Sequence, residues 1–445
     1  MMKNLLILHL ESINRQRLAA FGSSFPNTKR LMQDALVFDN FFSSATSTLM
    51  VITYLFHGND FEFDTASEFE GMRPAANNRN LFSILESRGY NANLICLNAF
   101  NAASPTRLVS WPDDLPPVWG TNDFPTLFDR FDELTDEPPF AIYVWDLITH
   151  IEHSLALAPF SSGLTDQIRR ACGVADDAVG VILATLERKG MLDNTTVVIY
   201  GDHGDDYWTH SFKGGMIHAT EPYTQITWTP LAIRDPALTP GTNENLASTI
   251  DIAPTCLALL GINDASLFLP SGTNLLVRAP ELVFSQNFTA NQADNWEFGI
   301  VKAFAAIDDT YILLVNSRGL ELYAYRVDPG NHCNLLHFFN VMPDGRLLLH
   351  GRPGVASHFR SALQDNPRAV ANLAAHFRTL RVALAERVAA KRAYIVGSGV
   401  EPTFALDPRC LTAVDDKARA AFFRGADNVQ PSRASMPAFD FSKLR

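Results

Sequence analysis

The stretch Thr195–Asp205, TTVVIYGDHGD, decides how the rest of the chain is interpreted. Its first six residues are all β-branched or aromatic, which is typical of a strand. Directly after the strand, Asp202 and His203 offer one oxygen and one nitrogen ligand to a single metal ion. The flanking glycines, Gly201 and Gly204, are expected to let the backbone turn sharply enough to aim both side chains. The stretch therefore predicts a strand that ends in a metal-binding turn.

Short apolar runs alternate with helical patterns through the first two thirds of the chain. This alternation predicts an α/β fold with a mostly parallel central sheet and helices on both faces. Sites in such sheets form beyond the carboxyl ends of the strands, so the residues just after each strand are the candidates for function. The strand candidates are Leu5–Leu10, Val37–Phe42, Asn93–Leu97, Ala141–Trp145, Thr196–Tyr200 and Pro230–Ile233; the helix candidates begin after Pro26, near Leu81, near Thr165 and after Asp251.

After about residue 280 the pattern changes to short strand-like runs that follow one another. These runs predict a small antiparallel sheet, and Val370–Tyr394 forms a basic amphipathic pattern that is expected to be a helix packed on that sheet. We therefore predict a catalytic α/β domain over residues 1–280 and a smaller C-terminal α+β subdomain over residues 281–445. The runs are Leu282–Ser285, Ile300–Phe304, Thr310–Val315 and Glu321–Tyr325.

Composition restricts the classes of function. The chain has 445 residues, 47% of them hydrophobic, so it can bury a large core. Its formal net charge of -12 argues against a nucleic-acid partner, which would require a basic surface. No apolar run of membrane-spanning length occurs, and the N-terminal apolar run is interpreted as a strand instead of a signal peptide. Five scattered cysteines predict reduced thiols and a cytoplasmic location. The oligomeric state stays open.

Two further strand ends carry candidate functional groups. Glu11 follows the first strand candidate directly. The strand that ends at Phe42 runs into a hydroxyl-rich turn, SSATST over Ser43–Thr48, and then into an apolar helix that is expected to start at Thr46. A hydroxyl at a helix N-terminus is either a cap or a nucleophile at a site that favours anions, and the pattern alone leaves both open.

Histidines lie near two other strand candidates. His150 and His153 lie just past Ala141–Trp145, and His218 precedes the strand candidate Pro230–Ile233.

Taken together, the motifs resemble the sulfatase-like enzymes of the alkaline-phosphatase superfamily over roughly residues 3–340. They stand in that family's order along the chain, which makes the set specific. The matching pieces are the strand ending in Glu11-Ser12, Pro26-Asn27, Phe38-x-Asn40, Asp202-His203-Gly204, Pro222-Tyr223 before Thr229-Pro230-Leu231, Asp251–Thr255 leading to Leu260-Gly261-Ile262, and Leu322-Tyr323 with Asp328-Pro329 and Asn334-Leu335.

The resemblance implies a metal centre. By this resemblance one divalent ion, which is Zn, Mn, Mg or Ca, is surrounded by Glu11, Thr46, Asp202 and His203. His218, with His150 or His153, holds a second ion or contacts the oxyanion of the substrate. Lys213 is either a contact for the substrate anion or a solvated loop lysine. Asp205 and Asp206 are interpreted as supporting or surface groups.

The resemblance also bears on the nucleophile. Sulfatases carry C-x-P-S-R or S-x-P-S-R, which is converted to formylglycine, whereas Ser43–Thr48 has no cysteine, proline or arginine. The turn is more similar to that of phosphoethanolamine and phosphoglycerol transferases, whose nucleophile is a threonine. Thr46 is therefore the favoured nucleophile, and Ser44 is the alternative.

These features predict a metal-dependent hydrolase or transferase that cleaves phosphate esters or diesters through a threonine. The substrate would be a small-molecule, glycan or lipid-headgroup ester. One alternative is a sulfuric ester hydrolase without formylglycine. A second alternative, from another class, is a non-catalytic member of the fold that binds an anion or a glycan.

Overall fold

The computed structural model describes most of the chain. The described residues are 2–60, 63–64, 73–74, 79–97, 104–106, 118–121, 123–150, 163–206, 218–262, 271–287, 303–316, 318–350, 367–397, 411 and 413–421.

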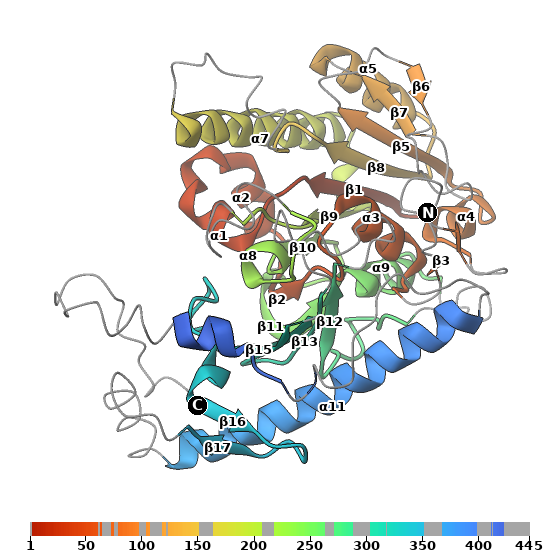
Figure 1. The fold of residues 1–445 in the computed structure, drawn as a ribbon. Coiled ribbons are helices and arrows are strands. Elements are labelled where there is room, and N and C mark those ends of the chain that lie inside the picture. Colours follow the sequence, from red (N-terminus) through yellow and green to blue (C-terminus); the bar gives the residue numbers. More distant parts are fainter. Residues whose placement is uncertain are drawn as a thin grey trace.

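A nine-stranded sheet forms the centre of the molecule (Figure 1). Its order is β11-β2-β10-β9-β1-β8-β5-β7-β6, and all neighbouring pairs are parallel except those that involve β10 and β6. The predicted mostly parallel sheet is thereby confirmed. The strands are β1 (Asn4–Leu10), β2 (Leu36–Phe42), β5 (Asn91–Leu97), β6 (Ser104–Thr106), β7 (Val118–Thr121), β8 (Phe140–Asp146), β9 (Thr195–Gly201), β10 (Leu231–Arg234) and β11 (Gly241–Ser248).

Helices cover both faces of this sheet, because alternate residues of each buried strand point to opposite sides. Leu5 and Ile7 of β1 pack in one core with helices α3 (Thr48–His57), α4 (Leu81–Glu86) and α9 (Ile252–Leu259). The intervening Leu6 and Leu8 pack in a second core. The helices of that second face are α1 (Arg15–Ala20), α2 (Pro26–Gln33), α5 (Phe124–Leu134) and α7 (Leu164–Arg188).

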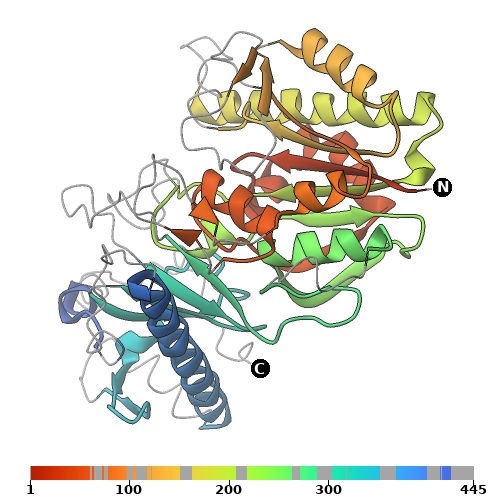
Figure 2. The same cartoon turned by 90° about the vertical axis from the view of Figure 1, so that its right-hand side faces the viewer.

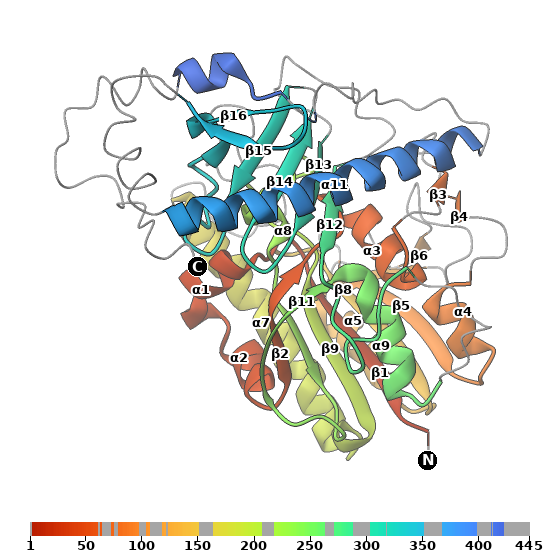
Figure 3. The same cartoon turned by 90° about the horizontal axis from the view of Figure 1, so that it is seen from below.

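A separate four-stranded antiparallel sheet follows, with the order β12-β13-β14-β15. The long helix α11 (Pro367–Gly397) lies across one face of it, as Figures 2 and 3 show. Leu373, Phe377, Leu380 and Leu384 of the helix are fully buried in the core that they share with this sheet, so the expected packing of the basic helix is observed. The strands are β12 (Val283–Gln286), β13 (Ala303–Ile307), β14 (Ile312–Asn316) and β15 (Gly319–Tyr323).

Shorter elements of the structure include two hairpins and the helix α8 (Thr224–Thr227). The hairpins are β3 (Phe63–Asp64) with β4 (Arg73–Pro74) and β16 (Phe339–Val341) with β17 (Leu347–Leu349). Among the helices that the structure describes, none combines the length and the apolar character needed to cross a bilayer. The domain boundary at residue 280 and the cytoplasmic location stay predictions.

Candidate active site

The candidate site lies where β1, β8 and β9 end together. Leu10, the last residue of β1, is in register with Gly201 of β9 on one side and with Asp146 of β8 on the other. Residues that follow these strands therefore meet at one edge of the sheet, as the rule for parallel sheets requires. Glu11 and Asp202 are the residues directly after β1 and β9, which brings the two predicted carboxylate ligands together.

Glu11 is fully buried and is fixed by side chains from two other segments. Its Oε2 accepts a hydrogen bond of 2.8 Å from Nε1 of Trp145, and its Oε1 accepts one of 3.0 Å from the hydroxyl of Thr48. The backbone N–H of Ser12 donates a hydrogen bond of 2.8 Å to Oδ1 of Asp202, which joins the ends of the two strands. The carboxylates are thus held in place by the fold itself.

Other polar atoms of the site lie close together without forming hydrogen bonds with one another. Oδ2 of Asp202 lies 3.1 Å from Nε2 of His203 and 3.2 Å from Nε2 of His9. In the described part of the chain, neither this oxygen nor Nε2 of His9 has a hydrogen-bond partner, although both are buried. His9, Glu11 and Asp202 can each turn one ligand atom to a common point, with the atoms within 4.8 Å of one another. Carboxylates and imidazoles arranged in this way suit a divalent cation.

The electrostatics of the site also favour a cation. Burial and the negative charge of Asp202 raise the pKa of Glu11 well above its usual range. Burial opposes ionisation of Asp202 as well, but the imidazoles of His203 and His9 hold the pKa of that carboxyl below its usual range. Burial lowers the pKa of His203 to about 4, so the imidazole is neutral at pH 7 and keeps a lone pair for a metal. A divalent ion here would offset the repulsion between the two carboxylates.

The glycines of the turn have a different purpose from the one predicted. Gly201 and Gly204 are absent from the residues with a left-handed backbone, so a sharp turn does not require them. They are required by close approach, because a Cβ on Gly201 would lie 2.1 Å from the backbone oxygen of Ile13. A Cβ on Gly204 would lie 2.0 Å from the backbone oxygen of Gln225. Neighbouring backbone therefore lies too close to the turn to leave room for a side chain at either glycine.

Gly204→Ala is expected to destabilise the protein by about 1–3 kcal/mol, because the added methyl meets backbone that cannot move aside. Chemical denaturation measures this change. Gly173→Ala is the matched control, since Gly173 lies within α7 and a Cβ there meets no atom within 4 Å. The control is expected to stabilise the protein by up to about 1 kcal/mol. Equal effects at the two positions would contradict the close-approach explanation.

The structure separates the two hydroxyls that the sequence favoured. The Ser44 Oγ is fully buried and lies 2.8 Å from the Oγ of Ser248, so it is engaged away from the carboxylates. Thr46 is also buried, and its hydroxyl has no hydrogen-bond partner among the described residues. The helix α3 begins at Thr48 with Ser47 at the N-cap, so the expectation that Thr46 starts the helix is wrong by two residues.

A third hydroxyl, that of Thr48, lies among the candidate metal ligands. Its Oγ1 donates to Oε1 of Glu11 at 3.0 Å and lies 2.9 Å from Nε2 of His203. The residue is half-buried and is the first residue of α3. Thr48 lies in the hydroxyl-rich turn at the end of β2, but the sequence predicted no role for it. Its place as the residue that opens the apolar helix was the signal available.

Two of the predicted histidines lie beside the candidate metal ligands. The ring of His218 stacks on the ring of His203, with 4.2 Å between centroids, and meets the ring of His150 edge-on at 5.1 Å. Nδ1 of His218 lies 3.0 Å from Oδ1 of Asp205, which is fully buried and lies 3.7 Å from Nη1 of Arg17. Asp205 therefore orients His218, consistent with its interpretation as a supporting group.

Two predicted residues cannot be compared with the structure, and one candidate ligand was not predicted. His153 and Lys213 lie outside the described residues. His9 was not predicted, although its spacing of two from Glu11 along a strand places both side chains on the same face. That spacing was the available signal.

Comparison with solved structures shows the class of fold. A 2-O GAG sulfatase superposes with a TM-score of 0.64 at 16% identity, covering 93% of this chain and 97% of that one. A protein of the alkaline phosphatase superfamily from Vibrio parahaemolyticus superposes with a TM-score of 0.51 at 16% identity, covering 72% and 79%. The protein therefore has the fold of the alkaline phosphatase superfamily.

Sequence comparison shows the family. The sulfatase family model matches residues 3–262, more than half of the chain, so the protein belongs to the sulfatase family. It is similar to an arylsulfatase of Volvox carteri (26% identity over 199 residues, 37% of this chain and 30% of the relative). It is also similar to lipoteichoic acid synthase 1 of Bacillus subtilis strain 168 (27% over 168 residues, 35% and 26%). The match spans less than a third of either relative.

Proposed function

We propose that the protein is a metal-dependent hydrolase or transferase of phosphate esters or diesters, with the Thr48 hydroxyl as its nucleophile. The observation that carries this proposal is the position of Thr48 Oγ1, 3.0 Å from Glu11 and 2.9 Å from His203. Thr46, which the sequence favoured, and Ser44 have no comparable contact with these side chains among the described hydrogen bonds. We therefore propose Thr48 as the nucleophile, in place of Thr46 or Ser44 of the same turn.

The arrangement supplies what attack on an ester requires. A divalent cation held by Glu11, Asp202 and His203 would lower the pKa of a hydroxyl beside it and neutralise the oxygens of the substrate. The Thr48 hydroxyl already donates to Oε1 of Glu11, which is placed to accept its proton. Its position at the first turn of α3 adds backbone N–H groups that favour an anionic substrate.

The reaction then proceeds in two displacements. Attack by Thr48 Oγ1 forms a bond to phosphorus and breaks the bond to the leaving alcohol, which takes up a proton. Water, or an acceptor hydroxyl in a transferase, then displaces Thr48 from phosphorus. His150 and His218 are the candidates for contacting the substrate oxyanion or protonating the leaving group, because their rings lie together next to His203.

Sulfate ester hydrolysis is the second candidate, and the relatives give a specific reason to keep it. One relative is an arylsulfatase, and one structural neighbour is described in complex with its substrate, D-glucosamine-2-N,6-O-disulfate (TM-score 0.58, 13% identity). The residues at the turn argue for phosphate, since no cysteine precedes α3 and the C-x-P-S-R context is missing. A glycan or lipid-headgroup phosphate is the class of substrate that we propose.

An aryl phosphodiester is expected to be turned over faster than the matching aryl sulfate in the presence of added Zn, Mn, Mg or Ca. The physical reason is that a threonine alkoxide attacks phosphorus and leaves a phosphoryl group that water can displace. Initial rates with matched aryl phosphate monoesters, phosphodiesters and sulfates measure the preference. The Thr48→Ala protein, purified identically, corrects for contaminating phosphatases. A sulfate ester that is cleaved fastest would contradict the phosphate proposal and favour the second candidate.

A further inference from the structure

His9 is a buried imidazole whose free nitrogen faces the candidate metal centre. It lies in β1, two residues before Glu11, and only 1% of it is exposed. Its Nε2 lies 3.2 Å from Oδ2 of Asp202 and 3.6 Å from Oε2 of Glu11. No hydrogen-bond partner for this nitrogen is present in the described part of the chain. A polar atom buried in this way is destabilising unless something binds it.

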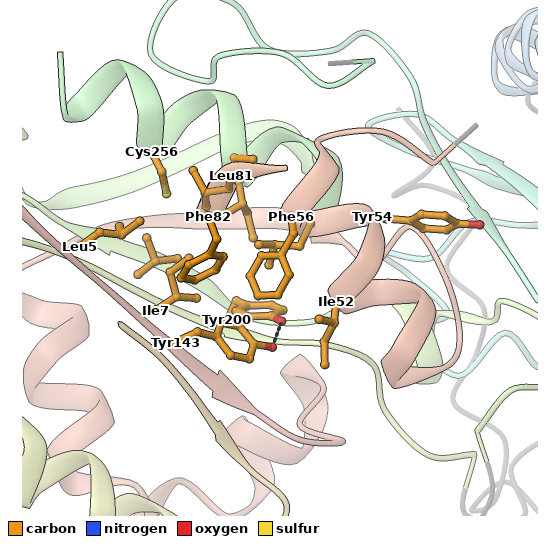
Figure 4. Close-up of a cluster of buried hydrophobic side chains, with 14 of the residues drawn as sticks. Leu5, Ile7, Ile52, Tyr54, Phe56, Leu81, Phe82, Tyr143, Tyr200 and Cys256 are labelled. Atoms are coloured by element: carbon orange, nitrogen blue, oxygen red, sulfur yellow. Dashed lines mark hydrogen bonds between the residues drawn. The ribbon is translucent and has the colours of Figure 1, made fainter. Parts of the chain in front are cut away.

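The imidazole ring is fixed by its neighbours. Its plane is within 3° of the ring of Trp145, with 5.8 Å between centroids, and it also stacks on Tyr200 at 5.1 Å. Nδ1 lies 2.6 Å from the hydroxyl of Tyr143, which lies 2.9 Å from the hydroxyl of Tyr200 (Figure 4). The side chain therefore cannot swing its nitrogen away from the carboxylates without leaving this packing.

The hydrogen-bond chain gives Nδ1 of His9 a fixed partner, the Tyr143 hydroxyl. Tyr143 and Tyr200 are both buried, and each hydroxyl can donate one hydrogen bond and accept another. When Tyr143 donates to Tyr200, its oxygen accepts from Nδ1–H of His9, and Nε2 then keeps its lone pair. Metal-binding histidines show this arrangement, in which the second ring nitrogen donates to a fixed acceptor.

We propose that His9 is a metal ligand through Nε2, in addition to Glu11, Asp202 and His203. This inference rests on the proposed metal centre but not on the substrate. Its chemical consequence is a donor set with two imidazoles and two carboxylates. Imidazole suits Zn and neighbouring transition metals, whereas Mg and Ca prefer oxygen ligands. The preferred ion is thus a transition metal, and His9 is the residue that sets this preference.

Titration calorimetry of the metal-free protein with Zn²⁺ and with Mg²⁺ tests the proposal without an activity assay. His9→Gln is expected to weaken Zn²⁺ binding by more than about tenfold and Mg²⁺ binding by less. Tyr143→Phe, which keeps His9 but removes the acceptor for Nδ1–H, is expected to weaken Zn²⁺ binding by about tenfold. His376→Gln is the control, because His376 belongs to the other described group of possible ligands, with Asp308 and Asp309.

Unchanged Zn²⁺ affinity in His9→Gln would overturn the proposal. A crystal structure of the Zn-loaded wild-type protein, with the ion placed by anomalous scattering, gives a test that does not depend on the folding of a variant. An ion bound by Nε2 of His9 would support the proposal, and an ion held by Glu11, Asp202 and His203 without His9 would overturn it. If wild-type protein binds Zn²⁺ through His9 but cleaves no ester, the proposed function fails and this inference stands.

Discussion

Thr48→Ala is expected to lower turnover of the best ester substrate by about 10³-fold or more. The change removes the attacking oxygen, and the metal centre and the binding contacts alone would account for the residual rate. Thr48→Ser keeps a hydroxyl at the same position and should retain much of the activity. Initial rates at saturating substrate and metal, with circular dichroism to show that each variant is folded, measure the effect.

The neighbouring hydroxyls provide matched controls for this prediction. Thr46→Ala and Ser44→Ala remove hydroxyls from the same turn but leave Glu11 and His203 unchanged. Both variants should keep turnover within about tenfold of the wild-type value, because the hydroxyl that each removes takes no part in the proposed reaction. If Thr46→Ala is inactive while Thr48→Ala is active, the nucleophile is the one that the sequence favoured and the reassignment is wrong. If Ser44→Ala alone is inactive, Ser44 is the nucleophile.

Removal of the metal is expected to abolish turnover and to lower the melting temperature. Glu11, Asp202 and His203 come from the ends of two strands, so an ion bound to all three ties the carboxyl edge of the sheet together. A ligand at 100 times its Kd stabilises the folded state by about 2.7 kcal/mol, which is lost on chelation. Thermal unfolding before and after chelation, and after adding Zn, Mn, Mg or Ca back, measures the change.

Variants at the two described groups of possible ligands show which one binds the ion. Asp202→Asn should remove both the metal-dependent stabilisation and the activity. Asp309→Asn, in the group with Asp308 and His376, should leave both unchanged. A melting temperature that does not respond to any of the four ions in the wild-type protein would contradict the metal centre.

Much of the fold could be predicted because its signals are local. Buried parallel strands such as β1 and β9 consist of continuous apolar runs. The helix α7 ends just before Gly190, whose left-handed backbone (φ 65°) is the conformation that glycine favours after a helix. The strand β11, GTNENLAS, was missed because it pairs with β2 alone and its first half is exposed, so it shows no apolar pattern. The antiparallel direction of β10 depends on long-range pairing, which a strand's own residues do not encode.

The candidate site was predictable as far as strand ends determine it. Glu11 and Asp202 directly follow strands and His203 follows Asp202, and the structure brings the three side chains together. Thr48 and Thr46 are threonines of one turn, and the contacts of Thr48 with Glu11 and His203 that distinguish them depend on residues distant in the sequence. His9 was overlooked because a histidine inside an apolar strand is usually a core residue, and its role depends on residues from β8 and β9.

Acid quenching during turnover, followed by peptide mass spectrometry, tests the central claim most directly. A phosphodiester or phosphonate monoester is mixed with the metal-loaded protein, and the quenched protein is digested and fragmented to localise any covalent group. The account predicts a phosphoryl or phosphonyl adduct on the oxygen of Thr48, which is absent when the metal has been chelated. An adduct on Thr46, on Ser44 or on a residue outside this turn would contradict it.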